Sequence, residues 1–436
     1  MSNKNGAISN DLVITHAARA LAAGDPLGAL NLVALRDDGP GLALRGIAMA
    51  QLGDLVRARV LLKSAARAFG PNDAVARARC VVAEAEIALV TRDLSGPTTS
   101  STSVRPAAAM TSLDAARATL EEHGDRLNSA HARFIDVRRL LLIGRLSEAE
   151  RIVGEIDPTP FPAALRAGYE LVVAGIAVRR LRAKAARAAL GTARRAARQA
   201  GIASLAAEVE TAIRVLDAPV ACLVAGREAG LQLGDRKGRL ILLDDVEAIL
   251  ASGALVVDAC RNVVRRADTA VSLASRPLLF EIVRALGEAW PDDAPRNTLI
   301  ERAFEMRIDD DEDRLRLRVE VGRLRAALEP LAAVISTKRG FALAPHETHE
   351  LVVLAPPVEE EHASALAQLS DGEAWSSSAL ALALGASQRS VQRMLESLEK
   401  SGKVQPVGRG RACRWIASPV IGFMTTMLLP GSLPTE

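Results

Sequence analysis

The sequence is poor in aromatic residues and in cysteine. Only 3% of its 436 residues are aromatic, and Tyr169 is the single tyrosine. A core with so few rings has to be built from Leu, Val, Ile and Ala, which favours packed, Ala-rich helices. Proteins that stack single-stranded bases on aromatic side chains become a less favoured class. The four cysteines lack the close spacing of a zinc knuckle or a redox pair, so we expect buried thiols in a reducing compartment.

Targeting and membrane-spanning segments are also missing. Residues 1–11 are polar and lack the apolar region of a signal peptide, and the apolar runs 171–178 and 421–429 are too short to span a bilayer. We therefore expect a cytoplasmic protein. The net charge is only +3, so contact with nucleic acid would have to come from a local concentration of Arg and Lys.

Motifs of catalysis and metal binding are absent from the sequence. Residues 226–238 contain several glycines but lack the Gly-Lys-Ser/Thr sequence that holds a phosphate. The six histidines have no ligand spacing with cysteines or acids, and the acidic run 309–313 lacks the alternation of a calcium loop. No Ser or Cys nucleophile motif occurs. We expect no enzyme, no cofactor and no bound metal.

The first half of the chain carries a degenerate helical repeat. In residues 44–71, a Gly-Asp pair at 53–54 separates two helical segments that carry small and large apolar residues at helical spacing. Pairs at 24–25 (Gly-Asp) and 144–145 (Gly-Arg) mark further units. The pattern is similar to the tetratricopeptide repeat, and this resemblance implies a solenoid of helix pairs over residues 1–218.

Three further features of this half are a concave surface, a predicted loop and a basic stretch. The resemblance implies a concave surface suited to a peptide or a protein partner, or a role in dimerisation. Residues 94–112 are rich in Ser, Thr and Pro, which predicts a loop. Residues 179–198 hold eight basic residues and no acid, which fits either a phosphate-contacting patch or a solvated helix face.

A different pattern begins after a connecting segment at residues 219–252. Short β-branched runs come first, then three helices with an apolar stripe, then a second pair of short runs. The expected elements are strands at 239–243, 254–258, 263–264 and 270–273, helices at 277–290, 298–304 and 314–328, and a hairpin at 334–343.

This second region resembles the winged-helix effector domain of OmpR/PhoB-type response regulators over residues 253–346. The resemblance is carried by the order of elements, by residues 321–325 (VGRLR) and by residues 335–341 (ISTKRGF). It implies a recognition helix in the major groove and a wing near the phosphates. No phosphoreceiver domain precedes it, so control by phosphorylation is not implied. The candidate DNA-contacting residues are Arg314, Arg316, Arg318, Arg323, Arg325, Lys338 and Arg339.

A third region, residues 363–417, follows a linker at residues 347–362. Helices are predicted at 363–369, 379–384 and 388–401, the last capped by Ser387, and a hairpin at 403–416. The run ALGASQRSVQRMLESLEKSGKV resembles the helix-turn-helix of many bacterial regulators, with a wing after it. The candidate DNA-contacting residues are Gln388, Arg389, Ser390, Gln392 and Arg393 on the helix, and Arg409 and Arg411 at the hairpin tip. An apolar tail follows at residues 418–436.

The sequence thus predicts a mainly α-helical fold: a tetratricopeptide-like solenoid, then two winged helix-turn-helix domains with small β-hairpins. The predicted function is a cytoplasmic, sequence-specific regulator of transcription that binds double-stranded DNA and forms a homo-oligomer, and whose solenoid binds a partner or mediates dimerisation. The alternative is a scaffold whose winged helices contact proteins.

Overall fold

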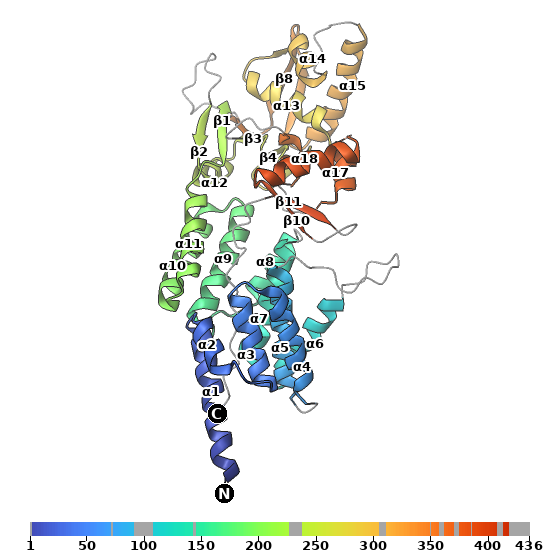
Figure 1. Ribbon diagram of the computed structural model, residues 1–436. Coiled ribbons are helices and arrows are strands. Elements are labelled where there is room, and N and C mark those ends of the chain that lie inside the picture. The colour runs from blue at the N-terminus through green and yellow to red at the C-terminus, as the bar shows by residue number, and fades with distance from the viewer. Residues whose placement is uncertain are drawn as a thin grey trace.

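The protein is mainly α-helical, with three small β-sheets among the residues that the structure describes. The computed structural model describes residues 2–70, 73–90, 108–142, 145–225, 238–304, 311–348, 350–356, 362–369, 375–384, 386–407 and 413–417. Figure 1 shows an elongated molecule, with the helices of the N-terminal half at one end and two smaller groups of helices and strands beyond them.

Helices follow one another in pairs through the described part of residues 2–216, which we call the helical array. They are α1 (Ser2–Ala22), α2 (Pro26–Val33), α3 (Gly39–Gln51), α4 (Leu55–Ala68), α5 (Ala74–Val90), α6 (Ala108–Glu122), α7 (Arg126–Leu142), α8 (Leu146–Gly154), α9 (Ala163–Arg179), α10 (Ala183–Ala200) and α11 (Ala203–Leu216). Each helix packs on its neighbour in sequence, and the odd-numbered helices also pack on one another in order. The predicted loop at 94–112 lies mostly outside the described residues, and its last part belongs to α6.

Short Gly-Asp turns join helices of the array. The glycine of each turn has a positive φ, which strains residues that carry a Cβ atom, and the aspartate caps the next helix. These turns lie at 24–25, 53–54 and 124–125, and their carboxylates accept hydrogen bonds from the backbone amides of Gly28, Arg57 and Asn128. The first two turns are predicted from the sequence, and the third is not. Gly144, predicted to mark another unit, lies outside the described residues.

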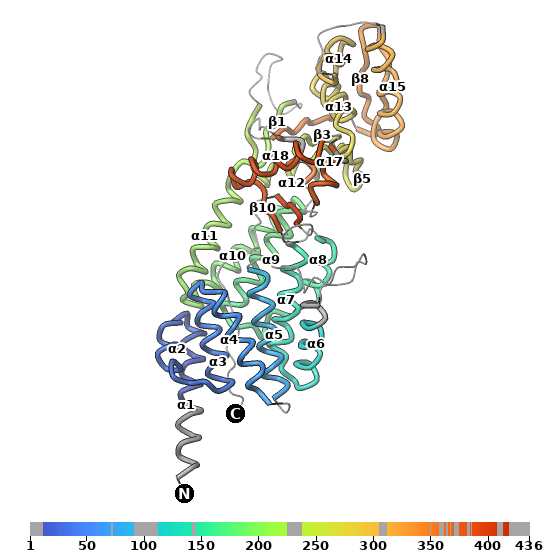
Figure 2. Tube along the Cα trace, turned by 45° about the vertical axis from the view of Figure 1, so that its right-hand side comes forward, coloured from blue at the N-terminus to red at the C-terminus, as the bar shows by residue number. Residues whose placement is uncertain are grey.

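The first and last turns of the helical array touch. A Cβ atom added to Gly24, between α1 and α2, would lie 3.2 Å from Cγ1 of Ile202, between α10 and α11. Figures 1 and 2 both place α2 beside one end of α10. The inner helices α3, α5 and α9 have no exposed residue. The resemblance implies a concave surface for a partner, and along α3, α5 and α9 the residues are largely covered, because their many Ala and Gly residues let neighbouring elements approach closely.

A fully buried ion cluster joins α5 to α7. Glu86 accepts hydrogen bonds from Nε2 of His131 (3.1 Å) and from Nη1 of Arg138 (3.0 Å), and none of the three side chains is exposed to solvent. Burial disfavours the charged form of Glu86, but His131 and Arg138 outweigh burial and hold its pKa below the ordinary 4.5. The carboxylate of Glu86 therefore supplies the counter-charge that makes the burial of Arg138 tolerable.

A mixed six-stranded sheet lies beyond the helical array, in the order β2-β1-β9-β3-β4-β5. Its elements are β1 (Ala221–Ala225), β2 (Arg239–Ile241), β3 (Leu255–Asp258), β4 (Val263–Arg266), β5 (Thr269–Ser272) and β9 (Leu351–Ala355), with helix α12 (Leu243–Ala251) between β2 and β3. The β3–β9 pair is parallel, with Leu255 opposite Leu351, and the other pairs are antiparallel.

Two segments differ from the sequence prediction. Residues 219–252, expected as a connection with one strand at 239–243, contain that strand as β2 and also β1 and α12. Residues 347–362, expected as a linker, contain β9. The strands β1 and β9 are short apolar runs that pair with each other across more than a hundred residues, so no local pattern marks them as partners. A domain that begins at residue 253 therefore leaves out strands of its own sheet.

Three helices and three strands form the central unit, residues 277–345. They are α13 (Pro277–Ala289), β6 (Ala294–Pro295), α14 (Arg296–Phe304), α15 (Asp311–Leu328), β7 (Ala332–Ser336) and β8 (Gly340–Pro345), with sheet order β6-β8-β7. Gly340 is required where β8 meets β6, since a Cβ atom there would lie 1.8 Å from the carbonyl oxygen of Ala294. The helices and the hairpin agree with the predicted ones to within a few residues.

The C-terminal unit, residues 363–417, has its own small core. Its elements are α16 (Ala363–Leu369), α17 (Ser377–Leu384), α18 (Gln388–Lys400), β10 (Val404–Val407) and β11 (Arg414–Ala417). As predicted, Ser387 caps α18, and its hydroxyl accepts a hydrogen bond from the amide of Ser390 at 3.1 Å. Leu380, Leu395 and Trp415 are buried together between the helices and the hairpin.

The two units share one order of elements. Each has a helix, a short extended segment, two more helices and a hairpin, and in each the extended segment pairs with the second strand of the hairpin. In the central unit β6 pairs with β8. In the C-terminal unit Trp375 and Trp415 exchange backbone hydrogen bonds of 3.0 and 2.7 Å. This repetition sets α15 and α18 in equivalent positions.

Replacing Glu86 by Gln should lower the free energy of unfolding by about 3–5 kcal/mol, because Arg138 then stays buried without this counter-charge. Urea denaturation measures the loss. The matched control is Glu148→Gln, which removes an exposed partner of Arg145 and should cost less than about 1 kcal/mol.

Comparing the unchanged protein with the Glu86→Gln protein also tests how the free energy of unfolding depends on pH. The folded-state pKa of Glu86 is lowered, so its stabilising contribution is complete above about pH 4.5 and is lost as the pH falls through the folded-state value. The Glu86→Gln protein should therefore lack this part of the acid destabilisation. An identical acid dependence in both proteins would contradict the assignment.

Candidate nucleic-acid interface

The outward face of α15 has an apolar centre. Leu315 and Val319 are 61% and 49% exposed, and with Gly322 and Ala326 they follow the i, i+4, i+7, i+11 spacing of one helix face. The opposite face carries the buried stripe that the sequence predicts, formed by Leu317, Val321, Leu324 and Leu328. Apolar side chains at the centre of such a face can contact thymine methyl groups or a protein surface.

Arginines flank this apolar centre. All five predicted arginines of α15 are exposed: Arg314, Arg316, Arg318, Arg323 and Arg325. Arg316 stacks over the ring of Phe304, with 4.4 Å to the ring centroid. Arg323 donates a hydrogen bond to Glu320 at 2.7 Å, which gives this acid a partner on the same helix. The flanks can still neutralise phosphates, since both contacts leave N–H groups facing solvent.

Arg325 differs from the other predicted contacts because it is used within the fold. Its guanidinium donates to the carbonyl oxygen of Val334 at 2.8 Å and to the hydroxyl of Ser336 at 2.9 Å. It also lies 5.9 Å from the ring centroid of Phe341. Arg325 therefore holds the β7–β8 hairpin against α15, a positioning role that its place in the sequence does not indicate.

The turn of the β7–β8 hairpin exposes Lys338 and Arg339, and two residues that the sequence motifs do not single out hold it. The hydroxyl of Thr337 donates to Asp293 at 2.6 Å. Arg296 donates to the carbonyl oxygens of Lys338 (3.0 Å) and Thr337 (3.1 Å). Asp293 and Arg296 flank β6, about forty residues before the turn, so their role becomes visible only once β6 has paired with β8.

The N-terminal half of α18 carries the second set of predicted residues. Gln388, Arg389, Gln392 and Arg393 are exposed opposite the buried face of the helix, and within the described residues no ion pair occupies either arginine. Ser390 is half-buried, and its hydroxyl lies 2.9 Å from that of Ser387, so it belongs to the helix cap. The amide of Gln388 donates to the hydroxyl of Ser377 at 3.4 Å. Exposed guanidinium and amide groups on one helix end can donate to and accept from base edges in a major groove.

The tip of the C-terminal hairpin carries the last predicted contacts. Arg409 and Arg411 lie outside the described residues. The strands beside them are described, and their cross-strand pairs alternate between two faces. On one face Val404 and Trp415 complete the core of the C-terminal unit.

The other face of the C-terminal hairpin packs on the helical array. Val407 and Ile416 are 2% and 3% exposed. They share a buried cluster with side chains from α5, α6 and α7, among them Leu89, Leu113, Leu120 and Ile135. Full burial of one such side chain stabilises a contact by about 1.5–3 kcal/mol, so these two side chains attach the hairpin appreciably.

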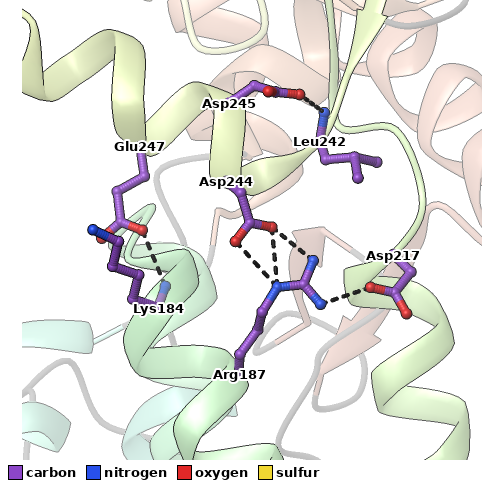
Figure 3. Close-up of polar contacts among 7 residues, drawn as sticks. All are labelled: Lys184, Arg187, Asp217, Leu242, Asp244, Asp245 and Glu247. Carbon is purple, nitrogen blue, oxygen red and sulfur yellow. Dashed lines mark hydrogen bonds and ion pairs between the residues drawn. The ribbon is translucent and has the colours of Figure 1, made fainter.

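Four of the eight basic residues of the 179–198 stretch form side-chain ion pairs with acids. Figure 3 shows Arg187 on α10 between Asp244 of α12 (2.6 Å) and Asp217 (2.7 Å), with the amide of Lys184 donating to Glu247. Hydrogen bonds to these acids raise the pKa of Arg187 and, in return, lower that of Asp244. Further pairs are Arg180 and Arg182 with Glu150, and Arg194 with Glu210.

Through Arg187 this stretch fastens the helical array to α12, which lies between β2 and β3 of the sheet. Of the two interpretations, a structural helix face fits the pairing better than a phosphate-contacting patch. Among the predicted contacts of the other two units, Arg339 lies 3.8 Å from Asp293, whereas no ion pair among the described residues involves Arg389 or Arg393.

Other kinds of site find no support in the described part of the chain. No cluster of three or more His, Cys, Asp or Glu residues there has the arrangement of a metal site. No described helix combines the length and the apolar character needed to cross a membrane. Comparison with protein-family models, with curated proteins and with solved structures finds no match to this chain.

Replacing Gly322 by Ala should raise the free energy of unfolding by about 0.5–1 kcal/mol, because Ala favours a helix interior over Gly. A Cβ atom at this position meets nothing within 4 Å, so no strain offsets the gain. Denaturant unfolding measures the change. A loss of stability would show that the outward face of α15 is covered.

Proposed function

We propose that the protein is a transcription regulator that binds double-stranded DNA through two winged helix-turn-helix domains. The observation that carries this proposal is the shared topology of the central and C-terminal units. Each has three helices and a hairpin, an extended segment paired with the second hairpin strand, and arginines exposed on the third helix. In such domains the third helix enters the major groove and the hairpin lies near the backbone.

The central unit suits an OmpR/PhoB-type winged helix. Antiparallel strands β3, β4 and β5 precede its three helices, and the β7–β8 hairpin closes it with Lys338 and Arg339 exposed at the turn. The turn is fixed in advance by Asp293 and Arg296, which lowers the entropy cost of presenting its two cations to phosphates.

The helical array suits a tetratricopeptide-like solenoid that supports the DNA-binding units and receives a partner. Gly-Asp turns, small residues at helix contacts and stacking of alternate helices all support this assignment. Because the described inner helices are covered, we place partner contact on the outer surface. There Leu27 and Leu32 of α2 and Leu35 just after it are exposed, which fits a protein partner or a second copy of the chain.

The two third helices suit different parts of recognition. The exposed end of α18 offers Gln388, Arg389, Gln392 and Arg393, whose side chains can form bidentate hydrogen bonds with adenine and guanine. The outward face of α15 offers apolar side chains with arginine flanks, which suits thymine methyl groups and phosphates. We therefore assign base reading by hydrogen bonds to α18.

A scaffold is the second candidate function, and the exposed Leu315, Val319 and Ile335 favour it. These three large apolar side chains lie on α15 and β7, where a protein partner could cover them. Dependence on salt separates the two functions, because phosphate contacts release counterions and lose affinity steeply as salt rises.

The test is selection from a pool of random duplex DNA at low and moderate salt, followed by fluorescence anisotropy on the enriched sequence. The Arg389→Ala/Arg393→Ala protein should bind that sequence about tenfold more weakly or worse, since each good base contact contributes about 1–3 kcal/mol of discrimination. The matched control is Arg57→Ala/Arg67→Ala, which removes two exposed arginines of α4 and should bind as the unchanged protein does.

Each outcome has a definite meaning for the proposal. An enriched motif whose binding depends on Arg389 and Arg393 supports reading by α18. Salt-sensitive binding without any motif would replace sequence-specific regulation by an architectural role. No binding at low salt would contradict DNA recognition and leave the scaffold as the better account.

A further inference from the structure

The C-terminal hairpin buries an apolar face that its own unit does not use. Val404 and Trp415 complete the core of the C-terminal unit, whereas Val407 and Ile416 are buried against α5, α6 and α7. The antiparallel register explains the division, because successive cross-strand pairs point to opposite faces. Figures 1 and 2 both place the C-terminal unit between the helical array and the central unit.

Three helices of the array build the surface that receives this face. Their contributions are Ala78, Val82 and Leu89 from α5, Leu113, Ala116 and Leu120 from α6, and Ala132 and Ile135 from α7. All of them are small or aliphatic, so this cluster recognises shape and apolar area. An apolar contact of this kind is stable in water but carries no directional bond that would make it permanent.

The C-terminal unit can leave this surface without losing its fold. Its core is a separate cluster that includes Leu380, Val391 and Leu395 and draws no side chain from the helical array. The chain connects it to the rest of the molecule through residues 356–362, between the end of β9 and the start of α16. The core of the C-terminal unit therefore forms without the contact to the helical array.

The docked hairpin is the same element that the proposed function uses as a wing. Arg409 and Arg411 lie between β10 and β11 in the sequence, and the strands beside them have one face on α5–α7. A wing that follows a DNA backbone has to approach the duplex together with α18. The helical array and DNA thus draw on the same element.

We propose that the α5–α7 surface is an intramolecular docking site for the C-terminal hairpin and that it competes with DNA for the C-terminal unit. This inference rests on the proposed function, because the competitor is the duplex that α18 reads. The occupant of the surface is the chain's own hairpin, and the apolar face formed by Val407 and Ile416 is what the surface recognises.

Docking then sets the strength of DNA binding. When only the undocked fraction of molecules binds, the apparent dissociation constant is the intrinsic one divided by that fraction. A chain that is undocked one time in ten binds about tenfold more weakly than its free C-terminal unit would. Weakening the docking contact should therefore strengthen DNA binding, the opposite of what loss of a DNA contact does.

The experiment uses the full-length chain with Val407→Asp, which puts a charge on the docked face and leaves Val404 and Trp415 in the core. We expect faster hydrogen exchange in α5–α7 and in β10, and at least fivefold tighter binding to the selected duplex. Val407→Ala should move both measurements in the same direction by less. The matched control is Val60→Asp, the same change at a valine of α4 that is 60% exposed. This control should alter neither the hydrogen exchange nor the affinity for DNA.

Fluorescence of Trp375 and Trp415 checks that the C-terminal unit stays folded in each variant. If neither Val407→Asp nor Val407→Ala alters hydrogen exchange in α5–α7, the proposed docking site is wrong. Faster exchange with equal or weaker DNA binding would overturn the competition. Faster exchange with no DNA binding by any of the proteins would refute the proposed function, and with it the competition, while the docking contact itself would stand.

Discussion

Parallel pairing of β3 with β9 is the contact on which the arrangement of the whole chain depends. Residues of these strands alternate between two cores: Val256 and Leu354 pack with the helical array, whereas Leu255, Val257, Leu351 and Val353 pack with the central unit. Helix α13 lies so close to this pair that a Cβ atom on Gly287 would be 3.0 Å from Val353. Two buried strands therefore couple the orientation of α15 to that of the array, and β9 also sets the point from which the C-terminal unit begins.

The parts of the fold that local patterns determine were predictable. Apolar spacing marks α13, α15 and α18, Ser387 marks the start of α18, and the Gly-Asp pairs at 24–25 and 53–54 mark turns. What the sequence does not reveal depends on partners far along the chain. The pairing of β1 with β9, the use of Arg325 inside the fold and the ties from Asp293 and Arg296 to the hairpin turn are of this kind.

Exposure of the candidate DNA contacts was largely predictable, and their division of labour was not. A helical wheel already places Arg389 and Arg393 opposite Val391 and Leu395. The apolar character of the outward face of α15 is equally legible in Leu315 and Val319, but a search for basic residues passes over it. The two units, alike in topology, thus present chemically different faces. Under the proposed function, a DNA site that fits both would offer adenine or guanine edges to the polar side chains of α18 and thymine methyl groups to the apolar side chains of α15.

The contact between the turn at Gly24 and Ile202 gives the first helix pair of the array a neighbour that an open stack would lack. A linear stack of helix pairs frays from its ends, because an end pair has a neighbour on one side only. Here a Cβ atom on Gly24 would lie 3.2 Å from Ile202. Fraying of α1 and α2 therefore breaks this contact as well as their packing on α3.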